Sequence, residues 1–239
     1  MFVRSRNLLL TLLFATLAAV SGCAFSSDEG GARRVMPLGQ ASFAQYAADA
    51  RAWVEANRSF VLAIEEGRAA ELEANLPREF RPAHPDGRGI LLVHGLGDSP
   101  WSFADLAESL SANGILVRTV LLPGCGTKPA DMMGATADDW RRVVKEQADI
   151  LAGEVDEMWL GGYSTGCNLV LDYAGGNPGK AKGFVLFSPA VEVRPPFAWA
   201  ASFVSRFRDW LVTPESRPDG GRNPFPVSYT HLRAHETLR

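Results

Sequence analysis

The residues best suited to chemistry lie in the pentapeptide GYSTG at positions 162–166, where Ser164 stands between two glycines. A serine hydroxyl becomes a nucleophile when a base, nearly always a histidine, removes its proton. An apolar run at residues 157–164 predicts a strand that leads into this turn, and a helix is predicted directly after it. A turn this sharp strains the serine and leaves no space for side chains at Gly162 and Gly166. The pattern therefore predicts a nucleophile mounted on a strand-to-helix turn.

Two further loops, HGLGDSP at residues 94–100 and LPGCGTKP at residues 122–129, also follow predicted strands. Ligands bind beyond the carboxyl ends of parallel strands, so we expect these loops to lie near the serine turn. The glycines of HGLG let the backbone N–H of Leu96 point at a substrate oxyanion, beside the N–H of Thr165. We interpret His94 as a structural residue of its turn, because backbone donors are what this loop contributes to the chemistry.

Strands and helices alternate along the chain in the order expected of βαβ units. Continuous apolar runs predict buried strands, and polar caps followed by periodic apolar residues predict helices. The predicted strands are residues 89–95, 115–124, 157–164 and 183–190, and the predicted helices are residues 99–114, 136–151 and 165–174. Upstream, Ser42 can cap a helix to about residue 63, and residues 71–88 are expected to be irregular or a short edge strand. This arrangement predicts one α/β domain on a doubly wound, mostly parallel sheet.

Four motifs between residues 89 and 190 resemble the α/β-hydrolase superfamily, in its branch of esterases, monoacylglycerol-lipase-like and serine-aminopeptidase-like enzymes. They are LLVHGLGDSPWSF, LLPGCGTKPADM, TADDW and LGGYSTGCNLVLDYA, in the family's order. The resemblance implies that Ser164 is the nucleophile and that Leu96 and Thr165 are the backbone oxyanion donors. It also implies an acyl-enzyme formed from small acyl esters, with no metal or organic cofactor.

Two cysteines depart from the family's pattern. Cys125 stands where the family usually has a histidine, in the loop commonly written PGHGT, and Cys167 follows Ser164 by three residues. Both belong to loops at the same end of the sheet. The N-terminal signal described below predicts export, and an exported protein meets an oxidising compartment. We therefore predict a disulfide between Cys125 and Cys167; the alternative is two buried free thiols.

The resemblance places a triad acid and then a histidine beyond the fourth predicted strand. Residues 194–226 show no further buried strand from which an acid could project. Apolar residues recur there at helical spacing, as at the start of a cap over a hydrolase site or in a packed surface helix; they are Trp199, Phe203, Phe207 and Trp210. We therefore expect the triad acid and histidine to be absent from this chain, and the sheet to be incomplete at its C-terminus.

The two downstream histidines, His231 and His235, invite a metal site or a triad histidine, and we reject both. Residues 227–237, VSYTHLRAHET, match letter for letter the translation of a transposase sequencing adapter. Such segments are excluded from fold reasoning. We expect residues 227–239 to be a non-native tail on a chain interrupted near Pro226. We also expect this chain to fold poorly and to be inactive, because a catalytic triad acts as a unit.

The N-terminus resembles a bacterial lipoprotein signal. A short basic stretch precedes an apolar run at residues 8–20, which is too short to span a membrane comfortably. Two small residues then precede Cys23, which implies that Cys23 is lipidated and anchors the protein to a membrane; Ala24 after it favours the outer membrane. The alternative is an ordinary signal peptide with an incidental cysteine. The expected segments are a signal peptide at 1–22, a tether at 23–40, a hydrolase core at 41–193 and the start of a cap at 194–226.

The overall composition is that of one globular domain. A hydrophobic content of 46% in 239 residues is enough for a core, and a net charge of −3 gives no reason to expect a nucleic-acid partner. The sequence thus predicts an exported, lipid-anchored serine hydrolase of carboxylic esters. One alternative is a non-catalytic envelope lipoprotein that uses the scaffold for binding. Another is a peptidase, thioesterase or acyltransferase, since the same machinery serves all three.

Overall fold

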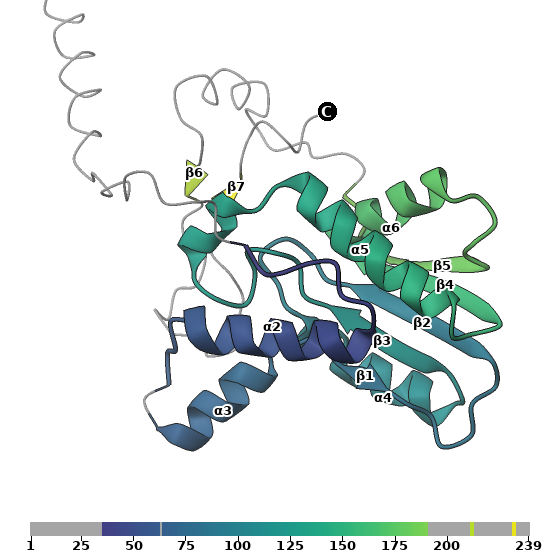
Figure 1. Cartoon of the computed structure of the whole chain (residues 1–239), viewed down its shortest axis with the longest axis horizontal. Helices are drawn as coiled ribbons and strands as arrows, with labels where there is room; N and C mark the ends of the chain where they lie inside the picture. Colours follow the sequence, from purple (N-terminus) through teal and green to yellow (C-terminus); the bar gives the residue numbers. More distant parts are fainter. Residues whose placement is uncertain (1–34, 63, 191–210, 213–230, 233–239) are drawn as a thin grey trace, which may run out of the picture. The chain divides into compact units, whose positions relative to one another are not determined.

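The computed structural model describes residues 35–62, 64–190, 211–212 and 231–232 (Figure 1). The predicted signal peptide with Cys23, nearly all of the predicted cap segment and most of the predicted non-native tail lie outside the described residues. Two short strands, β6 (Leu211–Val212) and β7 (His231–Leu232), pair with each other in antiparallel orientation. No helix in the described part of the chain is long and apolar enough to cross a membrane.

A five-stranded, mostly parallel sheet carries the fold, in the strand order β1-β3-β2-β4-β5. Its strands are β1 (Glu79–Phe80), β2 (Arg88–Val93), β3 (Leu116–Val120), β4 (Glu157–Tyr163) and β5 (Gly183–Phe187). The last four are parallel to one another, and β1 pairs antiparallel with β3 at one edge. The predicted α/β class, the four parallel strands and the short edge strand before them are confirmed.

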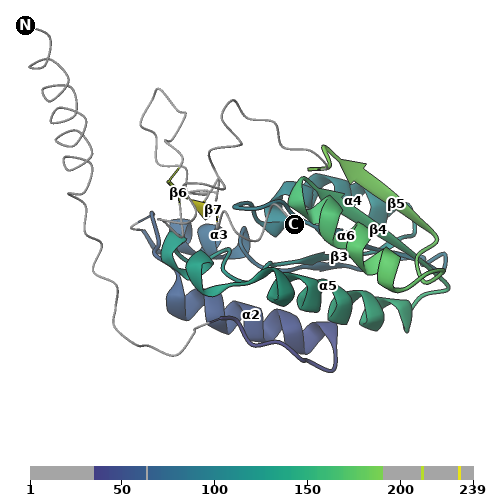
Figure 2. The same cartoon turned by 90° about the horizontal axis from the view of Figure 1, so that it is seen from above.

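Helices lie on both faces of this sheet, which makes it doubly wound (Figure 2). One face carries α2 (Phe43–Asn57), α5 (Ala137–Ala152) and α6 (Thr165–Gly176), and the other carries the 3-10 turn η1 (Pro100–Phe103) and α4 (Ala104–Ala112). Strand β2 supplies both cores, because Leu91 and Val93 pack under α2, α5 and α6 while Ile90 and Leu92 pack under α4. Successive side chains of a strand point to opposite faces, so a continuously apolar strand must be covered on both.

Polar caps place the helix starts as the sequence predicts. The Ser42 hydroxyl accepts the N–H of Gln45 at 3.2 Å before α2. At α5, Thr136 and Asp139 form a capping box, in which each side chain accepts the backbone N–H of the other residue. Each cap satisfies N–H groups that have no acceptor within the helix.

The first helix ends earlier than predicted, at Asn57 rather than near residue 63, and a second helix, α3 (Glu65–Glu73), follows it. The buried carboxylate of Glu71 on α3 accepts the N–H groups of Val61 and Leu62, each at 3.0 Å, and pairs with Arg58 at 2.7 Å. These N–H groups therefore have partners outside a helix, and the chain can turn away after Asn57. The prediction was wrong because a contact with a later helix, and not a local stop signal, ends α2.

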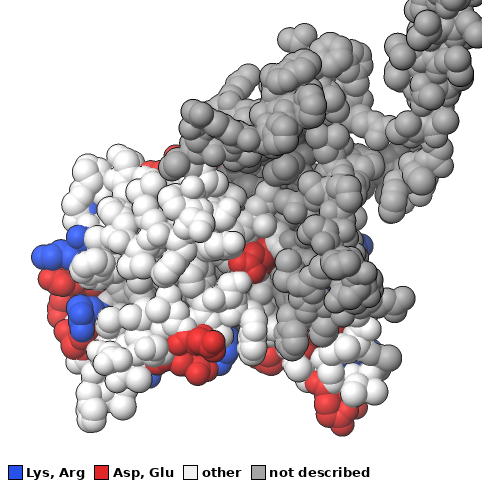
Figure 3. Space-filling model, turned by 180° about the vertical axis from the view of Figure 1, so that it is seen from behind, with Lys and Arg blue, Asp and Glu red and all other residues white. Residues whose placement is uncertain are grey.

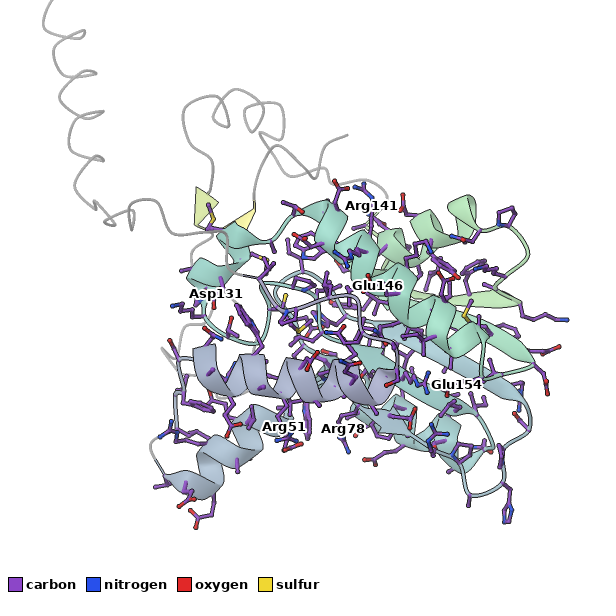
Figure 4. All side chains as sticks on the ribbon, in the orientation of Figure 1. Arg51, Arg78, Asp131, Arg141, Glu146 and Glu154 are labelled. Carbon is purple, nitrogen blue, oxygen red and sulfur yellow. The ribbon has the colours of Figure 1, made fainter. Side chains whose placement is uncertain are left out.

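Arg118 lies on β3 and is almost fully buried, with 1% of its surface exposed. Its guanidinium contacts Glu79 of β1 at 2.6 Å and Glu154, which follows α5, at 2.5 Å. It also lies 4.9 Å from the ring centre of Phe43. Glu154 is labelled near the end of α5 in Figure 4. The carboxylates of Glu79 and Glu154 and the ring of Phe43 offset the desolvation of the guanidinium. Because Phe43 begins α2 and Glu154 follows α5, these contacts connect α2 and α5 to the edge of the sheet.

Strand β5 is the outer strand of the described sheet, and its apolar side chains are exposed. Phe184, Val185, Leu186 and Phe187 each keep 37–40% of their surface in contact with solvent. A view from behind Figure 1 shows a broad area without acidic or basic side chains (Figure 3). A run of this kind is typical of a strand buried on both faces, so what would cover β5 is not among the described residues. Within the described sheet, β5 pairs with β4 alone.

Candidate active site

Ser164 stands between β4 and α6 in a conformation that residues other than glycine rarely adopt, with φ 51° and ψ −116°. Its backbone N–H donates to the carbonyl oxygen of Phe187 at 2.9 Å. Its own carbonyl oxygen accepts the N–H of Cys167 at 3.0 Å. These bonds hold the strained turn at the carboxyl edge of the sheet, where parallel α/β sheets bind ligands.

Both glycines of the motif are required by close backbone contacts. A Cβ atom at Gly162 would lie 2.6 Å from the carbonyl oxygen of Gly166. A Cβ atom at Gly166 would lie only 2.0 Å from the carbonyl oxygen of Val93, at the end of β2. The predicted collisions are confirmed, and they show that the start of α6 packs directly against the carboxyl end of β2.

The loop after β2 lies beside Ser164. A Cβ atom at Gly95 would lie 3.3 Å from the Cβ of Ser164 and 3.0 Å from the ring of Tyr163. Leu96 follows Gly95, and Thr165 is the first residue of α6, so the structure brings both close to Ser164. The N–H groups of a helix's first turn have no intrahelical acceptor and carry partial positive charge. This arrangement can present backbone donors to an anion that forms next to Ser164.

His94 is fully buried and both of its ring nitrogens are engaged. Nδ1 lies 2.7 Å from the carbonyl oxygen of Gly95, and Nε2 accepts the N–H of Leu122 at 3.1 Å. A carbonyl can only accept, so Nδ1 carries the proton and the ring is neutral. Burial lowers the pKa of His94, which also favours the neutral form. The interpretation of His94 as a structural residue is therefore confirmed.

The loop after β3 is held by charged side chains from other elements. Arg58 donates to the carbonyl oxygen of Gly126 at 2.7 Å, and Thr127 donates to Asp131 at 2.6 Å. Asp131 belongs to η2 (Pro129–Gly134) and is labelled in Figure 4. The buried Glu71–Arg58 pair thus connects α3 to this loop.

The disulfide predicted between Cys125 and Cys167 is not formed, and both cysteines are buried free thiols. Cys167 points under the turn, where its thiol lies 3.0 Å from the carbonyl oxygen of Gly162 and 3.3 Å from that of Phe187. Cys125 lies in the loop after β3 and is buried as well, with 6% of its surface exposed. The alternative of two buried thiols is the correct one.

No described residue offers a base to Ser164. The described histidine side chains are those of His84 and His94, and His94 is committed to two backbone groups. The backbone of His84 packs near Gly114, which precedes β3, so His84 lies at the opposite, amino end of the strands. Among the described residues nothing hydrogen-bonds to the Ser164 hydroxyl. The same residues contain no cluster of three or more His, Cys, Asp or Glu that could hold a metal ion.

Exposed aromatic side chains on β4, η1 and β5 were not predicted from the sequence. Tyr163, whose ring packs on Gly95, is 43% exposed, and Trp101 on η1 is 47% exposed. Phe187 ends β5, and its ring centre lies 6.2 Å from that of Phe103. The available signal was Trp101, a large aromatic residue two positions after the Ser99 cap, where a surface helix ordinarily has a polar residue. These rings offer apolar surface to an acyl group.

The doubly wound sheet, the strained serine between β4 and α6 and the donor loop beside it define an α/β-hydrolase. A family model, Hydrolase_4, described as serine aminopeptidase S33, matches residues 84–231. The chain belongs to this family.

Two of the relatives found are lipolytic enzymes. The chain is 34% identical over 105 residues to a thermostable monoacylglycerol lipase of Bacillus sp. (strain H-257), covering 44% of this chain and 42% of that lipase. A solved structure described with LipS and LipT, two metagenome-derived lipolytic enzymes, shares 27% identity with a TM-score of 0.53. The aligned part covers 67% of this chain and 64% of the chain in that structure. The chain therefore spans less than two thirds of the length of either relative. Its family and these two similarities make it a lipase/esterase-like α/β-hydrolase.

Proposed function

We propose that the complete protein is a serine hydrolase that cleaves carboxylic esters through an acyl-enzyme on Ser164. The observation that carries this proposal is the strained backbone of Ser164, φ 51° and ψ −116°, at the start of α6 and against the donor loop. Strain of this kind is kept at functional sites, where it presents a side chain that ordinary turns would bury. The likeness to a monoacylglycerol lipase supports an ester as the substrate.

In the proposed reaction, the Ser164 oxygen attacks the acyl carbon and gives its proton to a histidine supplied from outside the described residues. The N–H groups of Leu96 and Thr165 bind the oxyanion of the tetrahedral intermediate. The histidine then protonates the leaving alcohol as the carbon–oxygen bond breaks. Water, deprotonated by the same histidine, attacks the acyl-enzyme, and the acid departs while Ser164 regains its proton. No step uses a metal or an organic cofactor.

The proposed substrates are small acyl esters such as monoacylglycerols. Tyr163 precedes Ser164, and Trp101 lies on η1, whose Phe103 packs against Phe187. Both rings are exposed, and such surface favours an acyl chain over a charged peptide. The family description names a peptidase, so amide substrates are the competing class. A series of p-nitrophenyl esters, monoacylglycerols and aminoacyl anilides, assayed side by side, separates the two.

We further propose that the protein is exported, lipidated at Cys23 and anchored in the bacterial envelope, in the outer membrane, and that its native chain continues beyond Pro226. Metabolic labelling with a palmitate analogue tests the anchor: Cys23→Ala should abolish labelling, and unchanged labelling would contradict lipidation. Resequencing the locus across the codon for Pro226 tests the continuation. An uninterrupted native frame through residues 227–239 would refute it.

The decisive experiment is fluorophosphonate labelling of the protein from the complete gene, compared with Ser164→Ala. We expect labelling that disappears in the variant. A complete protein that folds but shows no Ser164-dependent labelling would instead be a non-catalytic envelope lipoprotein that binds ligands through the same scaffold. The complete sequence distinguishes the two independently, because the catalytic reading requires a histidine after the last strand.

A further inference from the structure

Cys167 contacts three carbonyl oxygens around the serine turn. Its backbone N–H donates to the carbonyl oxygen of Ser164 at 3.0 Å. Its thiol lies 3.0 Å from the carbonyl oxygen of Gly162 on β4 and 3.3 Å from that of Phe187 on β5. The residue is fully buried, with 0% of its surface exposed. One residue thus contacts the strand before the nucleophile, the nucleophile itself and the neighbouring strand.

The Cys167 thiol is a hydrogen-bond donor in this arrangement. Both oxygens beside the sulfur belong to carbonyl groups, which can only accept, so the sulfur carries its proton. Burial raises the pKa of this thiol, which keeps it protonated at neutral pH. A thiol has a single proton, so the nearer oxygen, that of Gly162, receives it, and the Phe187 oxygen lies close enough to share it.

The contact with Gly162 closes the serine turn across its base. The backbone on the two sides of the turn packs closely, because a Cβ atom at Gly162 would lie 2.5 Å from the backbone nitrogen of Cys167. The thiol therefore joins the end of β4 to the first turn of α6 beneath Ser164. Rotation of the strained backbone at Ser164 would break this contact. The thiol thus opposes relaxation of the turn to an ordinary conformation.

The contact with Phe187 connects the same turn to β5. The Phe187 oxygen also accepts the N–H of Ser164 at 2.9 Å, so the thiol and the nucleophile's own backbone bind one acceptor. The chain after β5 is held as well, because Nδ2 of Asn168 donates to the carbonyl oxygen of Ala190 at 3.1 Å. The first turn of α6 therefore binds the end of β5 and the segment that follows it. This leaves the shared oxygen little freedom to move.

We propose that Cys167 is a positioning residue that holds the Ser164 hydroxyl where it attacks the acyl carbon. The proposal rests on the proposed serine hydrolase function and assigns a role to a residue that departs from the family's pattern. The thiol lies beneath the turn and acts through the carbonyl oxygens of Gly162 and Phe187. A displaced hydroxyl slows acyl transfer more than it weakens ester binding, because the geometry of attack is needed only in the chemical step.

The test compares Cys167→Ala with Cys167→Ser in the protein from the complete gene. The two side chains leave a similar gap in the core, but only serine keeps a hydrogen-bond donor. In hydrolysis of a p-nitrophenyl ester, Cys167→Ala should lower kcat about 10-fold with KM changed less than about twofold. Cys167→Ser should recover most of the loss. The rate of fluorophosphonate labelling should change in parallel with kcat, because it depends on the same attack by Ser164.

Val170→Ala is the control for lost packing. Val170 lies further along α6 and is also 0% exposed, so its truncation should lower stability and leave kcat unchanged. Equal kcat values for Cys167→Ala and Cys167→Ser would overturn the proposal, and so would an equal loss of kcat in Val170→Ala. Absence of Ser164-dependent labelling in the unmodified protein would instead refute the proposed function, so the two failures are distinguishable.

An infrared measurement serves if Cys167→Ala fails to fold. The S–H stretching band that the unmodified protein shows and Cys167→Ser lacks belongs to Cys167. It should lie at a lower frequency than that of a thiol in an apolar solvent, because donation to a carbonyl oxygen weakens the S–H bond. A band at the frequency of a free thiol would contradict the proposal.

Discussion

Phe187 accepts the backbone N–H of Ser164 at 2.9 Å, which joins the end of β5 to the strained serine. The same carbonyl oxygen lies 3.3 Å from the thiol of Cys167 in the first turn of α6. The serine turn is therefore held by the neighbouring strand as well as by its own helix. Its conformation depends on the sheet, so substitutions that disturb this packing should change the backbone conformation of Ser164.

The turn tolerates no side chain at Gly166. Gly166→Ala places a methyl group 2.0 Å from the Val93 carbonyl oxygen, so we expect a loss of about 3 kcal/mol in the free energy of unfolding. Gly175→Ala, in the same helix with nothing within 4 Å of its Cβ, should instead gain about 0.5–1 kcal/mol. Urea denaturation of both variants measures the difference, and equal effects would contradict the close contact.

The two buried cysteines should behave as free but protected thiols. Iodoacetamide at pH 7.5 should leave Cys125 unmodified in the folded protein, because burial raises its pKa to about 12 and blocks access. Unfolding without a reductant should make Cys125 and Cys167 both reactive, as read by mass spectrometry of their peptides. A linked pair of the Cys125 and Cys167 peptides, separated only by reduction, would show that the two cysteines form a disulfide and would contradict this prediction.

Acid should weaken the fold through His94. Burial lowers the pKa of His94 in the folded protein, so the unfolded chain binds the extra proton first as the pH falls through about 6.5. The contribution to stability is present above this pH and is lost progressively below it. The nearby charge of Asp98 opposes the effect without reversing it.

Chemical denaturation at pH 7.5 and pH 5.5 checks this expectation. The free energy of unfolding should fall between the two pH values, and His94→Asn should show a smaller fall because its side chain does not titrate. Identical pH dependence in both proteins would mean that other groups dominate.

The exposed edge of β5 should make the 239-residue chain self-associate. Unpaired backbone groups beside apolar side chains invite pairing with another chain. Val185→Lys should reduce the association seen in sedimentation velocity, since a charge on an edge strand opposes pairing. Leu171→Lys, equally exposed at 38% but on α6, is the matched control and should have little effect.

The 239-residue chain should show no Ser164-dependent ester hydrolysis. Neither described histidine side chain is available to Ser164, because His94 is held by two backbone groups and His84 lies at the amino end of the strands. Loss of one triad member typically costs about 10⁴–10⁶ in rate. A fluorogenic ester assay of this chain beside its Ser164→Ala variant is sufficient. Turnover that the variant lacks would show that a base is present after all.

The sequence by itself determined the elements that depend on neighbours along the chain. Apolar runs, the caps at Ser42 and Thr136, and the glycines around Ser164 all act within a few residues, so the four parallel strands and the serine turn could be predicted. The pairing of the donor loop with Ser164 also followed, because parallel strands bring their carboxyl ends to one edge.

Only the tertiary structure decided what depends on distances across the sheet. Cys125 and Cys167 are separate buried thiols although both follow strands at the same edge, because the Cys167 thiol faces the carbonyl oxygens of Gly162 and Phe187. Glu71 binds the segment after α2 from a later helix, and Nε2 of His94 accepts the N–H of Leu122 from a loop distant in sequence. The sequence shows that buried polar side chains need hydrogen-bond partners, because an unsatisfied buried group costs free energy. Which partners they have depends on the tertiary packing.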